Sequence, residues 1–281
     1  MDEETVALPT GRRAGDWRIH GVSVEGYRHR RSGIPCQDAH LYTVSGPPRS
    51  SVTVLAVADG AGSRPRSDEG SVLAVELAVG RFADRAAGRA GGRAGGRPRT
   101  GAEIQAALRE AFHDVRTEFL RRTGQDADQF ATTLTVVVLT PTWIGHVSVG
   151  DGFAVLRAGT VDGVPQFHLL PQPAAVSEYS NETVFLTSAD AERRLSTACV
   201  TDPGVDGVLL STDGLAQVAL SWTDGQPRRP KESFVAAVLR TLDHPGADPE
   251  EDHRALAELL RSDRLTAVNA DDKTLLRAVR R

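Results

Sequence analysis

The chain has 281 residues, with 37 acidic residues against 33 lysines and arginines, so its formal net charge at pH 7 is −4. This balance gives no general affinity for nucleic acids or for anionic membrane surfaces, and no apolar run reaches the roughly 18 to 20 residues of a membrane span. Two cysteines are too few for a disulfide framework, and the acidic N-terminus lacks the apolar segment of a secretory signal, so a cytoplasmic location is expected.

The N-terminal half of the chain predicts a leader, three strands and two helices. Residues 1–16 combine proline, glycine and charge without apolar periodicity, which is typical of a disordered leader. Strands are predicted at residues 17–23, 39–44 and 51–58, the last completing the edge of a sheet. Apolar residues spaced at the helical period predict helices at residues 69–87 and 102–122.

A repeat of glycine and arginine separates these two predicted helices, at about residues 86–101. Such low complexity predicts a flexible loop. The alternative is a basic tether that binds an acidic partner.

The C-terminal half continues with strands and ends in helices and a last strand. Three successive strands, predicted to form a meander, lie at residues 132–139, 143–149 and 153–157. The segment 169–195 is mostly polar and irregular. Helices are predicted at residues 232–242 and 252–260, and a terminal strand at 273–279. Strands in runs, with helices grouped between them, argue against a doubly wound parallel fold.

Four short acidic motifs stand at predicted strand boundaries, at Asp38, Asp59, Asp213 and Asp271. Two of them follow near-continuous apolar runs, which are typical of strands buried on both faces. A single Asp-Gly pair is usually a plain turn, but its repetition after buried strands predicts that the carboxylates converge. Carboxylate oxygens without histidine or cysteine spacing suit Mg²⁺ or Mn²⁺ better than Zn²⁺.

The order and spacing of six motifs carry a resemblance to a known family. The motifs are Gly26-Tyr27-Arg28-His29 leading to Gly33–Asp38, then Ala58-Asp59-Gly60, Ala131–Leu134, Val149–Gly152, Ser211–Leu215 and Asp271–Thr274. In this order they resemble the PPM (type 2C) family of metal-dependent serine/threonine phosphatases, in its bacterial branch. The resemblance extends from about Trp17 to Val279.

This resemblance implies an α+β fold, an αββα sandwich in which two antiparallel sheets lie face to face and helices cover both outer faces. It also implies a single phosphatase domain over residues 17–281. The irregular segment 169–195 would then be a mobile flap beside the active site.

The resemblance further implies a site for two Mn²⁺ or Mg²⁺ ions and a third, weaker ion. Asp59 would bridge two ions, with the Gly60 carbonyl on one of them, while Asp213 and Asp271 would complete the first ion's ligands. Asp38 would act through a bridging water or an outer contact. Asp151 would bind the third ion; the alternative is that Asp151-Gly152 is only a hairpin turn.

Phosphate binding is less clearly marked, because Gly33 stands where the family commonly has an arginine. His29 and Arg31, just upstream, are the candidates to bind the phosphate, although a basic run is also typical of solvated surface. Gln37 replaces an acidic residue of the family pattern, and Ala61 replaces a histidine that is a candidate general acid in eukaryotic relatives. Cys36 is interpreted as a small buried residue, with an oxidation-sensitive switch as the alternative.

The leading hypothesis is a phosphoric monoester hydrolase that cleaves phosphoserine and phosphothreonine by attack of a metal-bridging water, which needs no protein nucleophile. Its partner would be a phosphoprotein such as a kinase or a kinase target, and a monomer is expected. The alternative is a catalytically weak pseudophosphatase that binds phosphoproteins, for which the departures at Gly33, Gln37 and Ala61 argue. A calcium-binding protein is a third reading, disfavoured because no Asp-rich twelve-residue loop is present.

Overall fold

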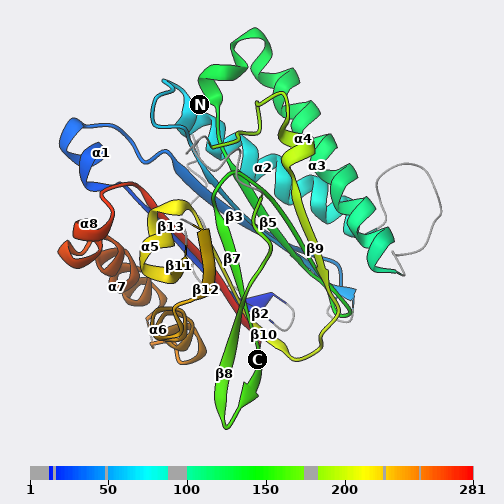
Figure 1. Ribbon diagram of the computed structural model, residues 1–281, viewed down its shortest axis with the longest axis vertical. Helices are drawn as coiled ribbons and strands as arrows, with labels where there is room; N and C mark the ends of the chain where they lie inside the picture. The colour runs from blue at the N-terminus through cyan, green and yellow to red at the C-terminus, as the bar shows by residue number, and fades with distance from the viewer. Residues whose placement is uncertain are drawn as a thin grey trace.

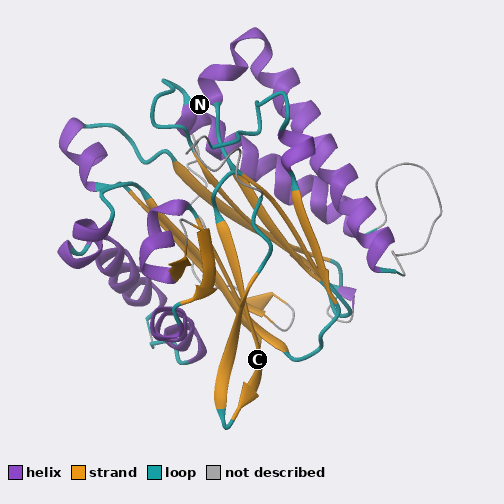
Figure 2. Cartoon of the chain, in the orientation of Figure 1, coloured by secondary structure: helices purple, strands orange, loops and turns teal. Residues whose placement is uncertain are grey.

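Two antiparallel sheets lie face to face, with helices on both outer faces (Figures 1 and 2), in a computed structural model of the chain. The structure describes residues 13–14, 17–47, 50–87, 100–173, 183–223, 226–246 and 248–280. Every strand pairing within these residues is antiparallel. The predicted αββα sandwich is therefore confirmed.

The first sheet has five strands in the order β3-β4-β5-β6-β9. They are β3 (Asp38–Ser45), β4 (Val52–Asp59), β5 (Leu134–Leu139), β6 (Ile144–Val149) and β9 (Ser196–Val200). The prediction that residues 51–58 form a sheet edge is wrong, since β4 pairs with β3 on one side and β5 on the other. This interior place explains why β4 is apolar along almost its whole length.

The second sheet has six strands in the order β1-β2-β13-β10-β7-β8. They are β1 (Arg13–Ala14), β2 (Trp17–Val24), β13 (Lys273–Arg280), β10 (Val205–Ser211), β7 (Phe153–Val161) and β8 (Val164–Leu169). Two expectations need correction. The predicted meander breaks after β6, because β7 crosses to this sheet and pairs with β10. Arg13 and Ala14, expected in a disordered leader, pair with β2; the rest of residues 1–16 lies outside the described residues.

The larger helices cover the outer faces of the two sheets (Figure 2). On the five-stranded sheet lie α2 (Ser67–Ala86) and α3 (Gly101–Thr123), and on the six-stranded sheet lie α6 (Glu232–Asp243) and α7 (Pro249–Arg261). The shorter elements are α1 (Tyr27–Ser32), α4 (Ala191–Arg194), α5 (Ala216–Ala219), α8 (Asp263–Val268), 3-10 turns at Gly124–Phe130 and Asp213–Leu215, and the hairpin of β11 (Leu220–Thr223) and β12 (Gln226–Pro230).

The Gly/Arg repeat lies where the sequence places it, between two helices. Helix α2 ends at Ala86 and α3 begins at Gly101, while residues 88–99 of the repeat lie outside the described residues. The start of α3 is fixed by a capping box, in which the Thr100 hydroxyl accepts from the Glu103 amide and the Glu103 carboxylate accepts from the Thr100 amide. No helix among the described residues is both long and apolar enough to cross a membrane.

Three apolar clusters hold the layers together, one between the sheets and one under the helices on each side. The cluster between the sheets contains Ile19, Leu55, Val137, Leu210 and Leu276, all of them fully buried. These residues come from strands of both sheets, so each sheet is buried on two faces. The ends of the strands are thereby held in fixed positions relative to one another.

His146 on β6 is buried, and neither of its ring nitrogens has a hydrogen-bond partner among the residues that the structure describes. Its strand partner Val137 belongs to the cluster between the sheets. Burial lowers the pKa of His146 to about 4. A buried polar group without a partner costs free energy of folding, and a buried base that stays neutral costs more when the solution is acidic.

We expect His146→Leu to raise the free energy of unfolding at pH 7.5 by about 1 to 3 kcal/mol, because it removes an unsatisfied polar group. Below the unfolded-state pKa of about 6.5, His146 binds a proton in the unfolded chain but stays neutral in the folded protein. The free energy of unfolding therefore falls by up to about 1.4 kcal/mol per pH unit until about pH 4. The variant should lose this part of the acid sensitivity in urea unfolding at pH 7.5 and 5.5. His168→Leu, at an exposed histidine of β8, is the control; an equal acid dependence in both variants would contradict this account.

Candidate metal centre

The aspartates predicted to converge stand at neighbouring ends of strands from both sheets. Asp38 opens β3 and pairs directly with Asp59, the last residue of β4. Asp151 lies in the turn between β6 and β7, Asp213 follows β10, and Asp271 precedes β13. The two sheets are packed face to face, so their strand ends bring carboxylates from distant parts of the sequence to one place.

Asp59, Asp151 and Asp213 form one group. Each offers a carboxylate oxygen, and these oxygens lie within 4.8 Å of one another. A second group with the same spacing consists of His29, Asp271 and Asp272. The negative charge of Asp271 raises the pKa of Asp59 and of Asp213, so the two groups lie close enough to interact.

Burial and mutual repulsion disfavour the charged carboxylates. The pKa of Asp38 is raised well above its usual value, first by burial and then by the charges of Asp272 and Asp213, against the hydrogen bond from Thr212. The pKa of Asp59 is raised for the same first reason, with Asp38 and Asp213 as the largest neighbouring charges. Burial, with Asp151 and Asp271, raises the pKa of Asp213 to about 7. The group is therefore short of positive charge.

A divalent cation fits this group of oxygens. Carboxylates are the ligands that Mg²⁺ and Mn²⁺ prefer, and the group of Asp59, Asp151 and Asp213 contains neither histidine nor cysteine. Lys273 supplies one positive charge nearby, and its ammonium group donates to the Asp271 carbonyl oxygen at 2.8 Å. Burial lowers the pKa of Lys273, which means that burial disfavours the charged form of this ammonium group.

Main-chain and hydroxyl contacts fix Asp38 and Asp59, which pair across β3 and β4. The carboxylate of Asp38, which is 6 % exposed, accepts from the Thr212 hydroxyl at 2.7 Å. The amide of Asp59 donates to the Thr133 hydroxyl at 3.0 Å, and its carbonyl oxygen accepts from the Thr132 hydroxyl at 2.9 Å. Asp151 and Asp271 lie on the exposed side, so the group opens to solvent there.

Gly60 is required by close packing, whatever its carbonyl binds. A Cβ atom at this position would lie 2.5 Å from the Ser67 carbonyl oxygen at the start of α2 and 2.8 Å from that of Gln37. The Gly60 amide donates to the same Gln37 oxygen at 3.0 Å. Only glycine fits between these two backbones. The coordination of an ion by the Gly60 carbonyl stays a prediction.

The two candidates for phosphate binding lie on α1, in different surroundings. Nδ1 of His29 lies 2.9 Å from the Asp272 carboxylate, in the group that includes Asp271. The guanidinium of Arg31 lies over the Tyr27 ring and donates to its hydroxyl at 3.4 Å on the exposed side of the helix. Of the two, His29 is the one beside the metal centre.

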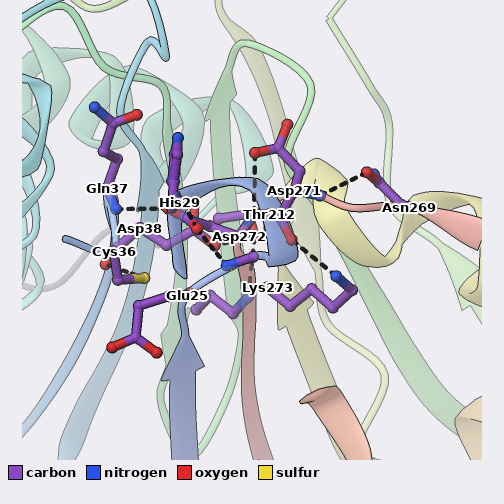
Figure 3. A network of polar contacts seen from close by, with 12 residues as sticks. Glu25, His29, Cys36, Gln37, Asp38, Thr212, Asn269, Asp271, Asp272 and Lys273 are labelled. Carbon is purple, nitrogen blue, oxygen red and sulfur yellow. Dashed lines mark hydrogen bonds and ion pairs between the residues drawn. The ribbon is translucent and has the colours of Figure 1, made fainter. Parts of the chain in front are cut away.

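Asp272 is one of two residues beside the centre that the sequence patterns did not single out. Its carboxylate is 3 % exposed and accepts from three donors: the Gly26 amide at 2.6 Å, the Gln37 amide at 2.6 Å and the His29 ring (Figure 3). The only signal in the sequence is the Asp271-Asp272 doublet. Thr212 was missed as well, since it stands inside a motif that was interpreted through Asp213.

Gln37, which departs from the family pattern, and Cys36 both stand just before Asp38. Gln37 is buried and its side-chain oxygen has no hydrogen-bond partner among the described residues. Cys36 is half-buried and its thiol donates weakly to the Asp38 carbonyl oxygen at 3.6 Å. Burial, followed by the charges of Asp38 and Asp272, raises the pKa of this thiol, which disfavours the reactive thiolate that an oxidation switch requires.

Comparison with known proteins gives one consistent result. The family model described as "Protein phosphatase 2C" matches residues 25–261. Serine/threonine-protein phosphatase 3 of Escherichia coli (strain K12) is 29% identical over 276 residues, covering 94% of this chain and 98% of that protein.

Solved structures share the fold at low sequence identity. Serine-threonine phosphatase 2C from Toxoplasma gondii has a TM-score of 0.66 at 14% identity, with 98% of each chain covered. The Mycobacterium tuberculosis serine/threonine phosphatase PstP/Ppp has a TM-score of 0.55 at 17% identity, covering 94% of this chain and 98% of that one.

We expect the affinity for Mn²⁺, measured by calorimetry, to fall as the pH is lowered from 8 to 6. The raised pKa values of Asp38, Asp59 and Asp213 mean that protons compete with the cation for the same oxygens. For each proton displaced, the loss should be about tenfold per pH unit below the pKa of the group. Asp213→Asn should bind Mn²⁺ more weakly and with a shallower pH dependence. Affinity that does not change over this range would contradict the competition.

Proposed function

This chain belongs to the protein phosphatase 2C family, and we propose that it hydrolyses phosphoserine and phosphothreonine esters in proteins with Mn²⁺ or Mg²⁺ held by its aspartates. The relatives it resembles are named serine/threonine phosphatases. The observation that carries the proposal is the convergence of Asp59, Asp151 and Asp213, whose carboxylate oxygens lie within 4.8 Å of one another.

Each predicted ligand has a role in this proposal. Asp59, Asp213 and Asp271, with the Gly60 carbonyl, would hold the two main ions, and Asp151 would hold a third. Asp38 would act through a bridging water or an outer contact. When bound, such ions supply a water of lowered pKa and neutralise charge on the phosphoryl group.

The chain's own residues hold the reacting groups in place. Hydrogen bonds from Thr132 and to Thr133 fix the backbone at Asp59, and Thr212 fixes the Asp38 carboxylate. A centre whose supporting residues are fixed needs little rearrangement during the reaction. The exposed side, at Asp151 and Asp271, is where a phosphorylated side chain can enter.

His29 is the proposed phosphate-binding residue. It lies beside Asp271, whereas Arg31 stacks on Tyr27 at the surface. An arginine is the stronger ligand for phosphate oxygens, so Arg31 remains the second candidate. Its side chain would have to leave the Tyr27 ring to reach the centre.

The remaining properties are proposals of the same kind. The substrate is a phosphoprotein such as a kinase or a kinase target, the chain acts as a monomer in the cytoplasm, and residues 17–281 form one phosphatase domain. Thr183, in the segment expected to form a flap, borders the proposed entrance, since its hydroxyl donates to the Asp151 carboxylate at 2.8 Å. The alternative of an inactive binding module has no support among the relatives, which are named as phosphatases.

The proposal is tested by hydrolysis of p-nitrophenyl phosphate with Mn²⁺. We expect turnover that EDTA abolishes and that Asp59→Asn lowers by more than about 100-fold, since even residues that only support a metal ligand cost 10- to 100-fold. Asp162→Asn is the matched control, because it removes one carboxylate at the exposed tip of the β7–β8 hairpin. If folded wild-type protein shows no turnover with any divalent cation, the hydrolase proposal is wrong.

A further inference from the structure

We infer that Asp272 and His29 form a catalytic pair, in which Asp272 positions the His29 ring and Nε2 of His29 gives a proton to the leaving serine or threonine oxygen. The inference rests on the proposed phosphatase function and adds a residue to it. It is carried by the geometry of a buried carboxylate with three donors and by the place of His29 beside the metal centre.

Asp272 holds the segment before Asp38 at three points. One carboxylate oxygen accepts from the Gly26 amide at 2.6 Å and from Nδ1 of His29 at 2.9 Å, and the other accepts from the Gln37 amide at 2.6 Å. Gly26 precedes α1 and Gln37 follows it, so both ends of this short segment are tied to one side chain. Because α1 has no buried residues, these bonds rather than apolar packing fix its position.

The hydrogen bond to Asp272 also determines which nitrogen of His29 is free. An ionised carboxylate only accepts, so Nδ1 must carry the hydrogen. Within the part of the chain that the structure describes, Nε2 makes no hydrogen bond. The ring is 14 % exposed, which leaves this edge open to a ligand while its rotation is fixed.

Figure 3 shows where the free edge of the ring points. The His29 ring stands beside the Asp271 carboxylate and the Gln37 side chain, and all three extend to the same side, away from Asp272. A ring nitrogen of His29 and an oxygen of Asp271 lie within 4.8 Å of each other. The imidazole therefore stands at the rim of the centre, on the side where Asp271 is exposed.

The reaction requires a proton at this rim. As the bond from water oxygen to phosphorus forms, the bond from phosphorus to the seryl or threonyl oxygen breaks and leaves its electron pair on that oxygen. His29 acts from its imidazolium form, in which both ring nitrogens carry hydrogen; the proton on Nε2 passes to this oxygen and gives the alcohol. The ring keeps the hydrogen on Nδ1 toward Asp272 and regains a proton from the attacking water through solvent, so one water is consumed and one phosphate is released.

Lys273 is the competing donor, and its contacts argue against it. Its ammonium group already donates to the Asp271 carbonyl oxygen at 2.8 Å, and the side chain is 2 % exposed. Arg28, Arg30 and Arg31 cannot act, because a guanidinium does not give up its proton in a protein. His29 is the remaining candidate near Asp271.

A series of aryl phosphates with leaving groups of increasing acidity tests the inference. A donor of this kind contributes about 10²- to 10⁴-fold when the leaving group is poor. We therefore expect His29→Gln to lower kcat about 100-fold or more with phenyl phosphate and a phosphothreonine peptide, but less than about tenfold with p-nitrophenyl phosphate. The plot of log kcat against leaving-group acidity should become steeper. Asp272→Asn should steepen it too, and the double variant should lose no more than His29→Gln alone.

The control is His113→Gln, which removes an exposed histidine on α3 that also pairs with a carboxylate, that of Glu192 at 2.9 Å. Equal losses in His29→Gln across the whole series would overturn the inference, and would leave His29 with only the phosphate-binding role proposed above or with a structural one. A loss of Mn²⁺ affinity in His29→Gln by calorimetry would overturn it in favour of a metal ligand. Absence of wild-type turnover would instead refute the phosphatase proposal itself.

Discussion

The central constraint on this structure is the unfavourable free energy of gathering carboxylates at one end of two facing sheets. Asp38 is buried, Asp59 and Asp213 are half-buried, and repulsion adds to the loss of hydration. The apolar clusters between and around the sheets supply the free energy that keeps these side chains in place. The uncompensated negative charge of such a site favours the binding of protons or of a cation. At neutral pH a divalent cation can replace the protons.

The neighbouring residues Asp271 and Asp272 show two ways to satisfy a carboxylate. Asp271 is exposed and belongs to the electrostatic field of the metal centre. Asp272 is buried, and three N–H donors satisfy it without a cation. Both residues lie just before β13, and their side chains extend into different surroundings (Figure 3). One side chain of the doublet therefore lies at the centre, and the other holds the segment before Asp38.

The sequence predicts the parts of this protein that follow from apolar patterns. The runs in β4 and β10 are buried, and the aspartates that follow them converge as expected. The pattern of β7 correctly indicates a strand but does not specify its partner, because β7 leaves the sheet of β6 and pairs with β10 in the other sheet. Helix α1 was not predicted, because a six-residue helix without buried residues has no periodicity to detect. The choice between His29 and Arg31 depends on that helix, so sequence patterns alone left it open.

The end of α1 explains why position 33 carries glycine and not the arginine that the family commonly has there. Gly33 ends α1 with φ of 65°, and its amide donates to the His29 carbonyl oxygen, an ending that favours glycine over any residue with a side chain. A Cβ atom there would meet nothing within 4 Å, so a longer side chain would begin in open space rather than in the centre. Closing the helix at Gly33 instead places His29 one turn earlier, where Asp272 can hold its ring. The proposed role of His29 therefore depends on where α1 ends and on the hydrogen bond between the His29 ring and Asp272.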